Sequence, residues 1–519
     1  MANKSIFHSN RRTTPQADTI NEAGSVAYRL DDKSALAQYV LTGVLNGTFY
    51  TSAKTEFNTL LSLIKHVNDP KFVAQLAVYA RTQGFMKDTP AVLLAWLSSK
   101  DSALAKEYLR SAFPLVIDNG KMLRNFVQII RSGVMGRKSL GSLPKKLVQR
   151  WFREHDATYI FKNSIGNDPS MVDVIKLAHP KPKTDEHNAL YGYLMGKDYN
   201  LNALPMVIQE YEAFKKDTTG LVPNVPFQFL SSLDMPEKVW KDIALNGGWH
   251  MVRMNLNTFL RHGVLYDSKV VDSICDKLRN PELIKKSKVF PYQIFTTFQN
   301  INALPVEIGL ALQDAMDIAI QNVPAFGKNV YVLPDTSGSM TQPVTGHRGT
   351  ATTATRCIDV AGLVASAVLR TTPTAKVLPF ATKVHNVDLN PRDSVMTNAK
   401  KLARLGGGGT NCSAPLEKIL MNGWDVDTVI YVSDNESWMD NRWSRYGTSS
   451  MEIWNKIKRN NKQAKCVCID VVPNRTAQMK EREDILNIGG FSDSIFNVID
   501  GFVNGSKDTF VNEIEKVEV

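Results

Sequence analysis

The hydrophobic positions of the chain follow two different patterns, and the change falls near residue 326. From about Ser34 to Asn322, apolar side chains recur at the i, i+3, i+4 and i+7 spacing of amphipathic helices, in segments broken by Gly, Pro or Asn. Each short-linked pair of helices needs a neighbour to cover its apolar face. We therefore expect antiparallel helix pairs stacked as an α-solenoid, with a degenerate repeat because no fixed period is visible.

Start signals place two of these helices, since Asp69-Pro70 opens one and Asp88-Thr89-Pro90 opens the next. Further helices are predicted at residues 101–117, 121–132, 143–155, 170–178, 185–196, 202–214, 236–246, 251–262, 267–279, 291–299 and 305–321.

After residue 326, short apolar runs that are typical of buried strands alternate with helical segments. Strands are predicted at residues 329–334, 375–381, 428–433, 465–472 and 494–499, and helices at 353–371, 393–404, 413–422, 449–460, 475–488 and 505–516. This alternation predicts a mainly parallel, doubly wound α/β (Rossmann-like) sheet. The expected organisation is an extended arm at residues 1–24, a helical repeat domain at 25–325 and the α/β domain at 326–519.

Oxygen-bearing side chains follow two of the predicted strands. The first strand ends in an Asp-x-Ser-x-Ser motif, a glycine run at residues 406–409 precedes a threonine, and the strand at 428–433 ends in an aspartate. Ligands of doubly wound sheets bind at the carboxyl ends of the strands. Carboxylates with hydroxyls suit Mg²⁺, with Mn²⁺ and Ca²⁺ as alternatives, rather than zinc. The predicted metal ligands are Asp335, Ser337, Ser339, Thr410 and Asp434.

Catalytic motifs do not accompany this predicted site. No His-Glu zinc pair, no Ser/His/Asp order and no P-loop occurs, because the glycine run is not followed by Gly-Lys-Ser/Thr. Two carboxylates leave a divalent ion receptive to an acidic partner, so we expect a binding site and no enzyme. A metal nuclease stays open as an alternative, because Glu436 and Asp440 lie close to Asp434 in sequence.

The chain has a net charge of +11, and its basic surplus is uneven. Residues 327–519 carry 23 Lys and Arg against 21 Asp and Glu, whereas residues 1–326 carry 39 against 30. A polyanionic partner should therefore bind the helical part, unless the surplus only serves solubility. One candidate basic segment contains Arg131, Arg137, Lys138, Lys145, Lys146 and Arg150, and a second contains Lys162, His179, Lys181 and Lys183. Arg253 and Arg261, on one predicted helix with Met254 and Leu260 facing inward, are weaker candidates for phosphate contact.

The cysteines and the first residues indicate the compartment. Five scattered cysteines are typical of reduced thiols, and the polar, basic residues 1–15 lack the apolar core of a secretory signal. No apolar run approaches the length of a membrane span. We expect a cytoplasmic protein that does not contact a membrane.

The oxygen motif resembles the metal-ion-dependent adhesion site of von Willebrand factor A domains, in residue type and in order. The stretches Ala77–Arg81, Asp88–Ala91 and Leu177–Pro182 look like the TROVE domain of Ro family proteins, and the junction from Asn322 to Lys328 is similar to the family junction. The likeness covers nearly the whole chain in one domain order. The chain is thus identified as a member of the Ro family, of the kind that bacteria and their phages carry.

This resemblance implies a ring of HEAT-like helical repeats closed by the A domain, in a protein that we expect to be a monomer. It also implies binding of small noncoding Y-like RNAs on the basic face, passage of single-stranded 3′ ends of misfolded RNAs, and partnership with a 3′-to-5′ exoribonuclease. His179 matches a family stretch that carries an RNA-contacting histidine. Gly166-Asn167-Asp168 replaces a second basic residue of the family. The alternative is a divalent-metal-dependent protein-interaction module whose helical part is purely structural.

Overall fold

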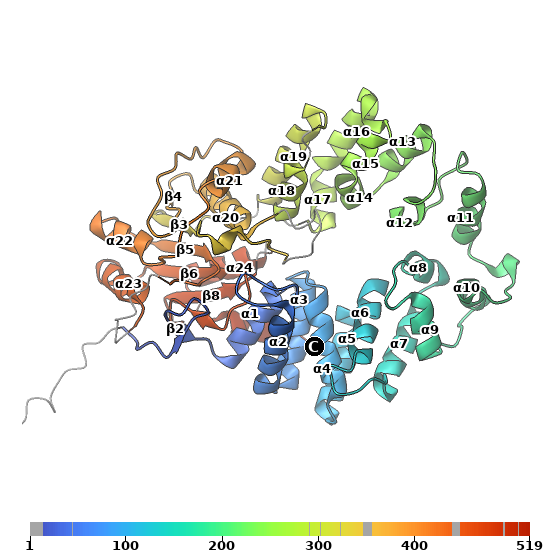
Figure 1. The fold of residues 1–519 in the computed structure, drawn as a ribbon, viewed down its shortest axis with the longest axis horizontal. Coiled ribbons are helices and arrows are strands. Elements are labelled where there is room, and N and C mark those ends of the chain that lie inside the picture. Colours follow the sequence, from blue (N-terminus) through green and yellow to red (C-terminus); the bar gives the residue numbers. More distant parts are fainter. Residues whose placement is uncertain are drawn as a thin grey trace, which may run out of the picture. The chain divides into compact units, whose positions relative to one another are not determined.

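A computed structural model describes residues 14–43, 45–289, 291–300, 303–321, 323–345, 355–438, 447–490, 492, 494–506 and 508–519. The chain forms two compact units, which are described separately. One unit comprises Met1–Val67 with Gln321–Glu513, and the other comprises Asn68–Ile320 with Ile514–Val519. Figure 1 labels the elements of both units along the chain.

A five-stranded parallel sheet forms the centre of the first unit, the α/β unit. Its strands are β3 (Val330–Pro334), β4 (Lys376–Val377), β5 (Thr428–Ser433), β6 (Lys465–Asp470) and β8 (Ile485–Gly489). They lie in the order β4-β3-β5-β6-β8, and every pair is parallel. The order of the sheet reverses between β3 and β5, which creates the switch point where doubly wound sheets bind ligands.

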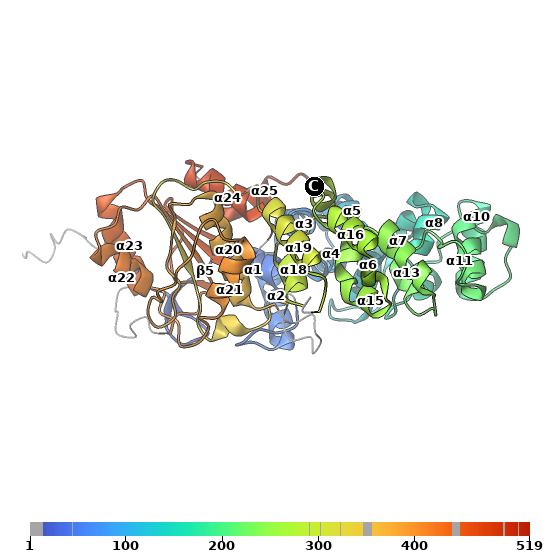
Figure 2. The ribbon, with the colours of Figure 1, turned by 90° about the horizontal axis from the view of Figure 1, so that it is seen from above.

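Both faces of this sheet are covered, as the continuously buried strands require. Helices α22 (Ala414–Met421) and α23 (Ser449–Asn460) pack on one face, where Trp454 is fully buried among side chains of β3, β5 and β6. Helix α20 (Cys357–Thr371) contacts β3, β4 and β5, and α21 (Val395–Ala403) packs against α20. Figure 2 shows the sheet between these two helical layers.

The N-terminal residues belong to the same unit. Strands β1 (Thr19–Ile20) and β2 (Val26–Arg29) form an antiparallel sheet with β7 (Thr476–Ala477), and α1 (Asp32–Thr42) contacts β8. Helix α2 (Ala53–Val67) packs against α1. The expected boundary at residue 24 therefore differs from this grouping, because residues 25–67 belong to the compact α/β unit. Residues 1–13 of the expected arm lie outside the described residues.

The sequence prediction was wrong near the C-terminus of the α/β unit. The predicted helix at 475–488 contains β7 and β8, and the predicted strand at 494–499 is part of helix α24 (Ser494–Val503). Five consecutive buried residues form β8, whereas Ile495, Phe496, Ile499 and Phe502 are buried at helical spacing. The last helix, α25, covers Phe510–Glu515.

The second unit, the helical unit, follows the predicted pattern. Its α-helices are α3 Pro70–Thr82, α4 Asp88–Ser99, α5 Ala103–Val116, α6 Gly120–Arg131, α7 Ser142–Glu154, α8 Ala157–Lys162, α9 Met171–Ala178, α10 Asp185–Met195, α11 Met206–Lys216, α12 Phe227–Leu230, α13 Glu237–Asn246, α14 Trp249–Met254, α15 Leu256–Arg261, α16 Ser268–Leu278, α17 Pro281–Ser287, α18 Pro291–Gln299 and α19 Val306–Ala319.

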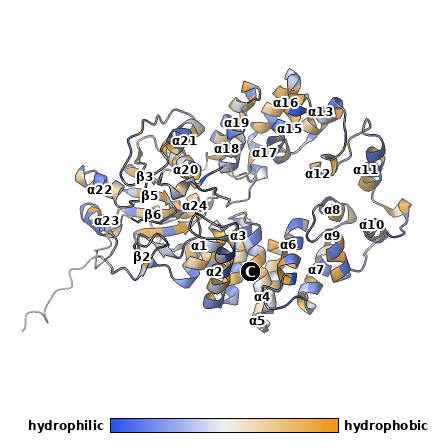
Figure 3. Cartoon of the chain, in the orientation of Figure 1, coloured by the Kyte–Doolittle hydropathy of each residue, from blue (hydrophilic) through white to orange (hydrophobic). Residues whose placement is uncertain are grey.

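Helices of this unit pack mainly against near neighbours in sequence, for example α3 with α4 and α5, α7 with α9, and α16 with α17 and α19. This is the packing of stacked helical repeats. Most helices carry both hydropathy colours along their length in Figure 3, as amphipathic helices do. The predicted helix at 251–262 is divided at Asn255 into α14 and α15.

No helix among the described residues is both long enough and apolar enough to cross a membrane.

Replacement of the buried Trp454 tests the assigned core of the α/β unit. Trp454 is fully buried, and its indole N–H donates to Asp484 Oδ2 at 2.8 Å. We expect Trp454→Ala to destabilise the α/β unit by about 3–5 kcal/mol, since it creates a cavity. Calorimetry should show a thermal transition moved to lower temperature. Met421→Ala is the control, because Met421 is 86% exposed; equal shifts for both variants would contradict the assigned core.

Candidate functional site

The five predicted metal ligands come from three segments at the carboxyl ends of β3 and β5. Asp335 directly follows β3, Asp434 directly follows β5, and both carboxylates are fully buried. Ser337, Ser339 and Thr410 are buried as well. The strand pairing between Pro334 and Val432 places the two aspartates at the same edge of the sheet.

Backbone hydrogen bonds hold the glycine run against the Asp-x-Ser-x-Ser loop. The N–H of Gly338 donates to the carbonyl of Gly408, and the N–H of Gly407 donates to the carbonyl of Thr336, both at 2.9 Å. Gly407 and Gly408 have φ angles of 137° and 85°, which side chains rarely permit. The run thus works as a permissive backbone that carries Thr410 to the loop.

Hydrogen bonds orient the Asp335 carboxylate but leave part of Asp434 without a partner. Asp335 accepts from the N–H of Ser337 at 2.8 Å and from the Ser433 hydroxyl at 2.6 Å. The Ser337 and Ser339 hydroxyls lie 3.3 Å apart. Oδ2 of Asp434 is buried and has no hydrogen-bond partner. A buried carboxylate oxygen without a donor is costly, which favours a cation beside it.

The pKa values of both aspartates are raised, which also indicates that their buried negative charge lacks compensation. Burial, together with the Asp434 charge, raises the pKa of Asp335 from 3.8 to about 7. Burial also raises the pKa of Asp434. A divalent ion would stabilise both charged forms. The donor set, two carboxylates and three hydroxyls, therefore fits a hard cation such as Mg²⁺.

The described residues give no support to a two-metal nuclease. No group of three or more His, Cys, Asp or Glu among them is arranged to hold a metal ion. Burial raises the pKa of Glu436 to about 9, and its carboxyl accepts from the N–H of Ala23 at 3.0 Å. Asp440 lies outside the described residues.

Sequence reasoning missed the neighbours that residues 21–52 bring to this site. Burial, followed by the Asp434 charge, raises the pKa of Tyr50 to about 12, and a hydrogen bond to the Ser339 side chain acts in the opposite direction. The backbone N–H of Phe49 donates to the side chain of Gln342. No sequence signal could have found Tyr50, because its contact depends on how α1 and α2 pack on the α/β unit.

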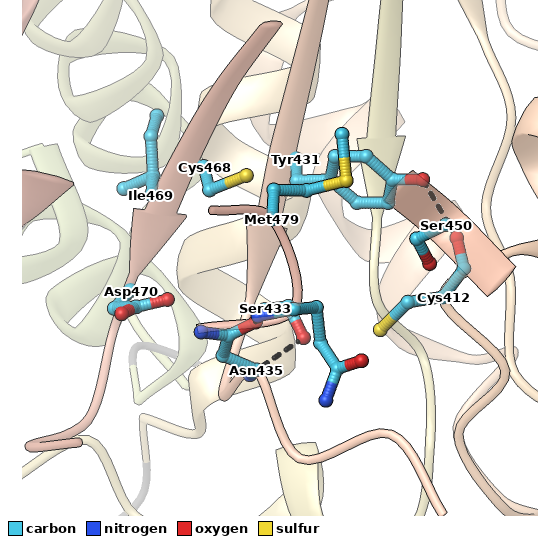
Figure 4. Close-up of a pocket in the computed structure, with 10 residues that line it drawn as sticks. Cys412, Tyr431, Ser433, Asn435, Ser450, Cys468, Ile469, Asp470 and Met479 are labelled. Carbon is cyan, nitrogen blue, oxygen red and sulfur yellow. Dashed lines mark hydrogen bonds between the residues drawn. The ribbon is translucent and has the colours of Figure 1, made fainter. Parts of the chain in front are cut away.

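A small cavity lies beside the metal site, between the ends of β5 and β6. It has a volume of about 10 Å³, which is enough for roughly one water molecule. Figure 4 shows Asp470, Ser433, Asn435 and Ser450 around it. The Asp470 Oδ2 and Ser450 Oγ atoms are buried without partners. This cavity therefore suits an internal water and not an organic ligand.

The first candidate basic segment spans the end of α6, a loop and helix α7. Lys138, Lys146 and Arg150 are exposed, Lys145 is partly exposed, and Arg131 is exposed at the end of α6. Leu147, Val148, Trp151 and Phe152 form the opposite, buried face of α7, which turns its basic residues outward.

Gln149 joins the two candidate basic segments. From α7, its side-chain amide donates to the carbonyl of Ala178 at 2.7 Å and reaches that of His179 at 3.4 Å. His179 ends α9 in the left-handed conformation, with φ of 52°, and is exposed. Lys181 and Lys183 follow it and are exposed too. We use the name α7–α9 basic surface for the set formed by Lys145, Lys146 and Arg150 of α7 with His179, Lys181 and Lys183.

Two other predicted basic residues, Arg137 and Arg253, have structural contacts. The Arg137 guanidinium donates to Ser98 Oγ at 3.0 Å, and burial lowers its pKa. Arg253 is buried and donates to the carbonyl of Gln293 at 2.8 Å, and burial lowers its pKa to about 10. Lys162 ends α8, which packs against α10 and α11.

Two further details concern the weaker candidates and the glycine at 166. Arg261 is exposed. Met254 is 69% exposed, so the expectation that it faces inward was wrong.

Gly166 lies against the Arg124 guanidinium. A Cβ atom at this position would come within 2.7 Å of that group, so a larger residue would not fit without a shift.

The raised pKa of Asp335 predicts a pH-dependent stability of the metal-free protein. The folded state holds this proton up to about pH 7, whereas the unfolded chain releases it near 3.8. The protonated Asp335 carboxyl therefore contributes fully to the free energy of unfolding below pH 3.8. This contribution is lost as the pH rises through 7, by at most about 1.4 kcal/mol per pH unit. In EDTA, melting temperatures of Asp335→Asn should depend less on pH between 5 and 8 than those of the wild type. Parallel profiles would contradict the assignment.

Comparison with known proteins agrees with this architecture. Residues 330–503 match the model of the Ro60 vWA domain. The chain is 24% identical to the RNA-binding protein RO60 of Deinococcus radiodurans, over 93% of this chain and 95% of the relative. The crystal structure of the Deinococcus radiodurans RO (RSR) protein has the same fold, with a TM-score of 0.62 and 21% identity over 92% of this chain and all of the other. The chain is therefore similar to an RNA-binding Ro60 protein over nearly its whole length, and residues 330–503 match the Ro60 vWA domain.

Proposed function

We propose that the protein binds RNA through the α7–α9 basic surface and does not act as an enzyme. The observation that carries the proposal is the Gln149 link, because it joins two basic segments that are separate in sequence into one exposed surface. The Deinococcus relative is an RNA-binding protein, which supports the same conclusion, and the Ro60 family is not enzymatic.

The surface is chemically suited to phosphate groups. Lys146 and Arg150 are four residues apart on α7, so their side chains leave the same face of the helix about 5–6 Å apart at Cβ. Arg150 forms one exposed ion pair with Glu154, at 2.5 Å, which phosphate can displace at little cost. Exposed lysines bind phosphate without reading sequence, so RNA structure would decide the choice of partner.

We propose small noncoding, Y-like RNAs as the structured ligands of this surface, and single-stranded 3′ ends of misfolded RNAs as further ligands. The protein would act in quality control of noncoding RNA or as an adaptor to a 3′-to-5′ exoribonuclease. In the α/β unit, Asp335, Ser337, Ser339, Thr410 and Asp434 would hold Mg²⁺. The bound ion would supply an open coordination position for a partner carboxylate. The alternative function, a metal-dependent protein-interaction module, needs only this site.

Charge reversal on α7 tests the RNA surface. Lys145→Glu with Lys146→Glu should weaken the binding of a structured small RNA at least about tenfold, because two phosphate contacts become repulsive. The slope of log affinity against log salt should fall in magnitude by about one to two. A gel-shift series over salt concentration measures both quantities.

Lys285→Glu with Lys286→Glu is the matched control. These adjacent lysines are exposed on α17 of the same unit, and the change in net charge is identical. Equal loss of affinity in the two double variants would mean that only total charge matters, and the α7–α9 basic surface would be the wrong assignment.

Removal of one carboxylate tests the metal site. Asp335→Ala should reduce Mg²⁺ or Mn²⁺ affinity by about a hundredfold or more, and it should leave RNA binding unchanged. Titration calorimetry with the metal alone gives the affinity, and Asp425→Asn, an exposed aspartate of the same unit, is the control. Unchanged metal affinity in Asp335→Ala would refute the site, and simultaneous loss of RNA binding would contradict the separation of the two functions.

A further inference from the structure

A second concave site lies in the helical unit and is lined by residues of α12, α13 and α15 and of the turns beside them. Figure 1 labels these three helices. Its volume of about 480 Å³ is in the range of small-ligand sites. Three aromatic side chains, Phe227, Trp240 and His262, line it. The remaining lining is polar or basic and comes from Ser231, Asn255, Thr258 and Arg261.

The aromatic side chains form a short stack. The Trp240 and His262 rings are nearly parallel, with centroids 4.0 Å apart and an angle of 14°. Phe227 meets Trp240 edge-on at 6.0 Å. Trp240 is buried and fixed by this packing, whereas His262 is exposed at the end of the stack. A flat aromatic ligand can continue such a stack at its exposed end.

The charge of the lining and its unpaired hydrogen-bond donors indicate which kind of ligand the cavity can bind. The lining holds the Arg261 guanidinium and no carboxylate. Arg261 donates to Thr258 Oγ1 at 3.2 Å, and in the described part of the chain it forms no ion pair, so it has donors left for an anion. The nearby Glu237 and Asp267 both pair with Lys241, at 2.9 and 3.2 Å. The buried Trp240 Nε1 has no hydrogen-bond partner and therefore lacks an acceptor.

We propose that this cavity binds one unpaired base of single-stranded RNA. The base stacks on the exposed face of His262, and a neighbouring phosphate pairs with Arg261. An aromatic stack with a cation and polar side chains is how proteins hold single-stranded nucleic acid. The absence of carboxylates from the lining disfavours a cationic ligand. The inference rests on the proposed RNA binding and adds a site for bases to the α7–α9 basic surface, which contacts phosphates.

The test uses the full-length protein and two short single-stranded RNA oligonucleotides of equal length, one with bases and one abasic. We expect the wild type to prefer the oligonucleotide with bases. His262→Ala should weaken its binding by about five- to a hundredfold, the effect of losing one stacking contact. His262→Phe should restore much of the affinity because it keeps a flat ring. None of these substitutions should alter binding of the abasic oligonucleotide.

Arg261→Gln should weaken the binding of both oligonucleotides, since both carry phosphates. Lys238→Gln is its matched control, because Lys238 is exposed on α13, two residues before Trp240, and does not line the cavity. Photocrosslinking with a thiouridine-containing oligonucleotide should label residues of α12, α13 or α15. Equal losses in Arg261→Gln and Lys238→Gln would show a general charge effect and overturn the proposed phosphate contact.

The outcomes separate this inference from the proposed function. The base site alone would be overturned if His262→Ala bound the oligonucleotide as the wild type does, while the Lys145/Lys146 double variant lost affinity for structured RNA as expected. Loss of oligonucleotide binding in His262→Ala, with structured RNA bound normally by that double variant, would support the base site and overturn the α7–α9 basic surface. Absence of any RNA binding by the wild type would overturn both.

Discussion

Parallel pairing of β3 with β5 is the constraint from which the α/β unit is built. The register of these strands brings Asp335 and Asp434 to one edge of the sheet, where both are fully buried. Burial of two carboxylates together is unfavourable unless a proton or a cation compensates them. We therefore propose that the hydroxyls and the glycine run around them complete a cation site.

Basic residues of the helical unit serve two separate purposes. Arg124 and Lys277 donate to backbone carbonyls, Arg124 to Asn163 at 2.8 Å and Lys277 to Leu245 and Gly247 at 2.6 and 2.7 Å. Such cations satisfy the ends of helices and loops, and they offer little charge to a ligand. Exposed residues such as Lys146 and Arg150 are those that we propose for RNA binding, so the net charge alone overstates the proposed binding surface.

Much of this organisation could be predicted from the sequence, and the failures have physical causes. Helical periodicity and the Asp-x-Ser-x-Ser motif depend on local sequence. The helical unit, the sheet and the positions of Asp335 and Asp434 at its edge could therefore be predicted. The C-terminal strand and helix were misassigned because short apolar runs fit both structures. Contacts between distant segments, such as those of Tyr50 and Gln149, depend on tertiary packing, which the sequence pattern does not encode.

We propose that the helical unit binds RNA and that the α/β unit binds a cation at a separate site. Hydrogen–deuterium exchange of the full-length protein, with a structured small RNA and with Mg²⁺ in turn, tests this separation most directly. We predict that RNA protects amides of α7 and residues 178–183, whereas Mg²⁺ protects residues 335–340, 407–411 and 434–436. Protection of the metal loops by RNA alone, with none on α7, would contradict the account.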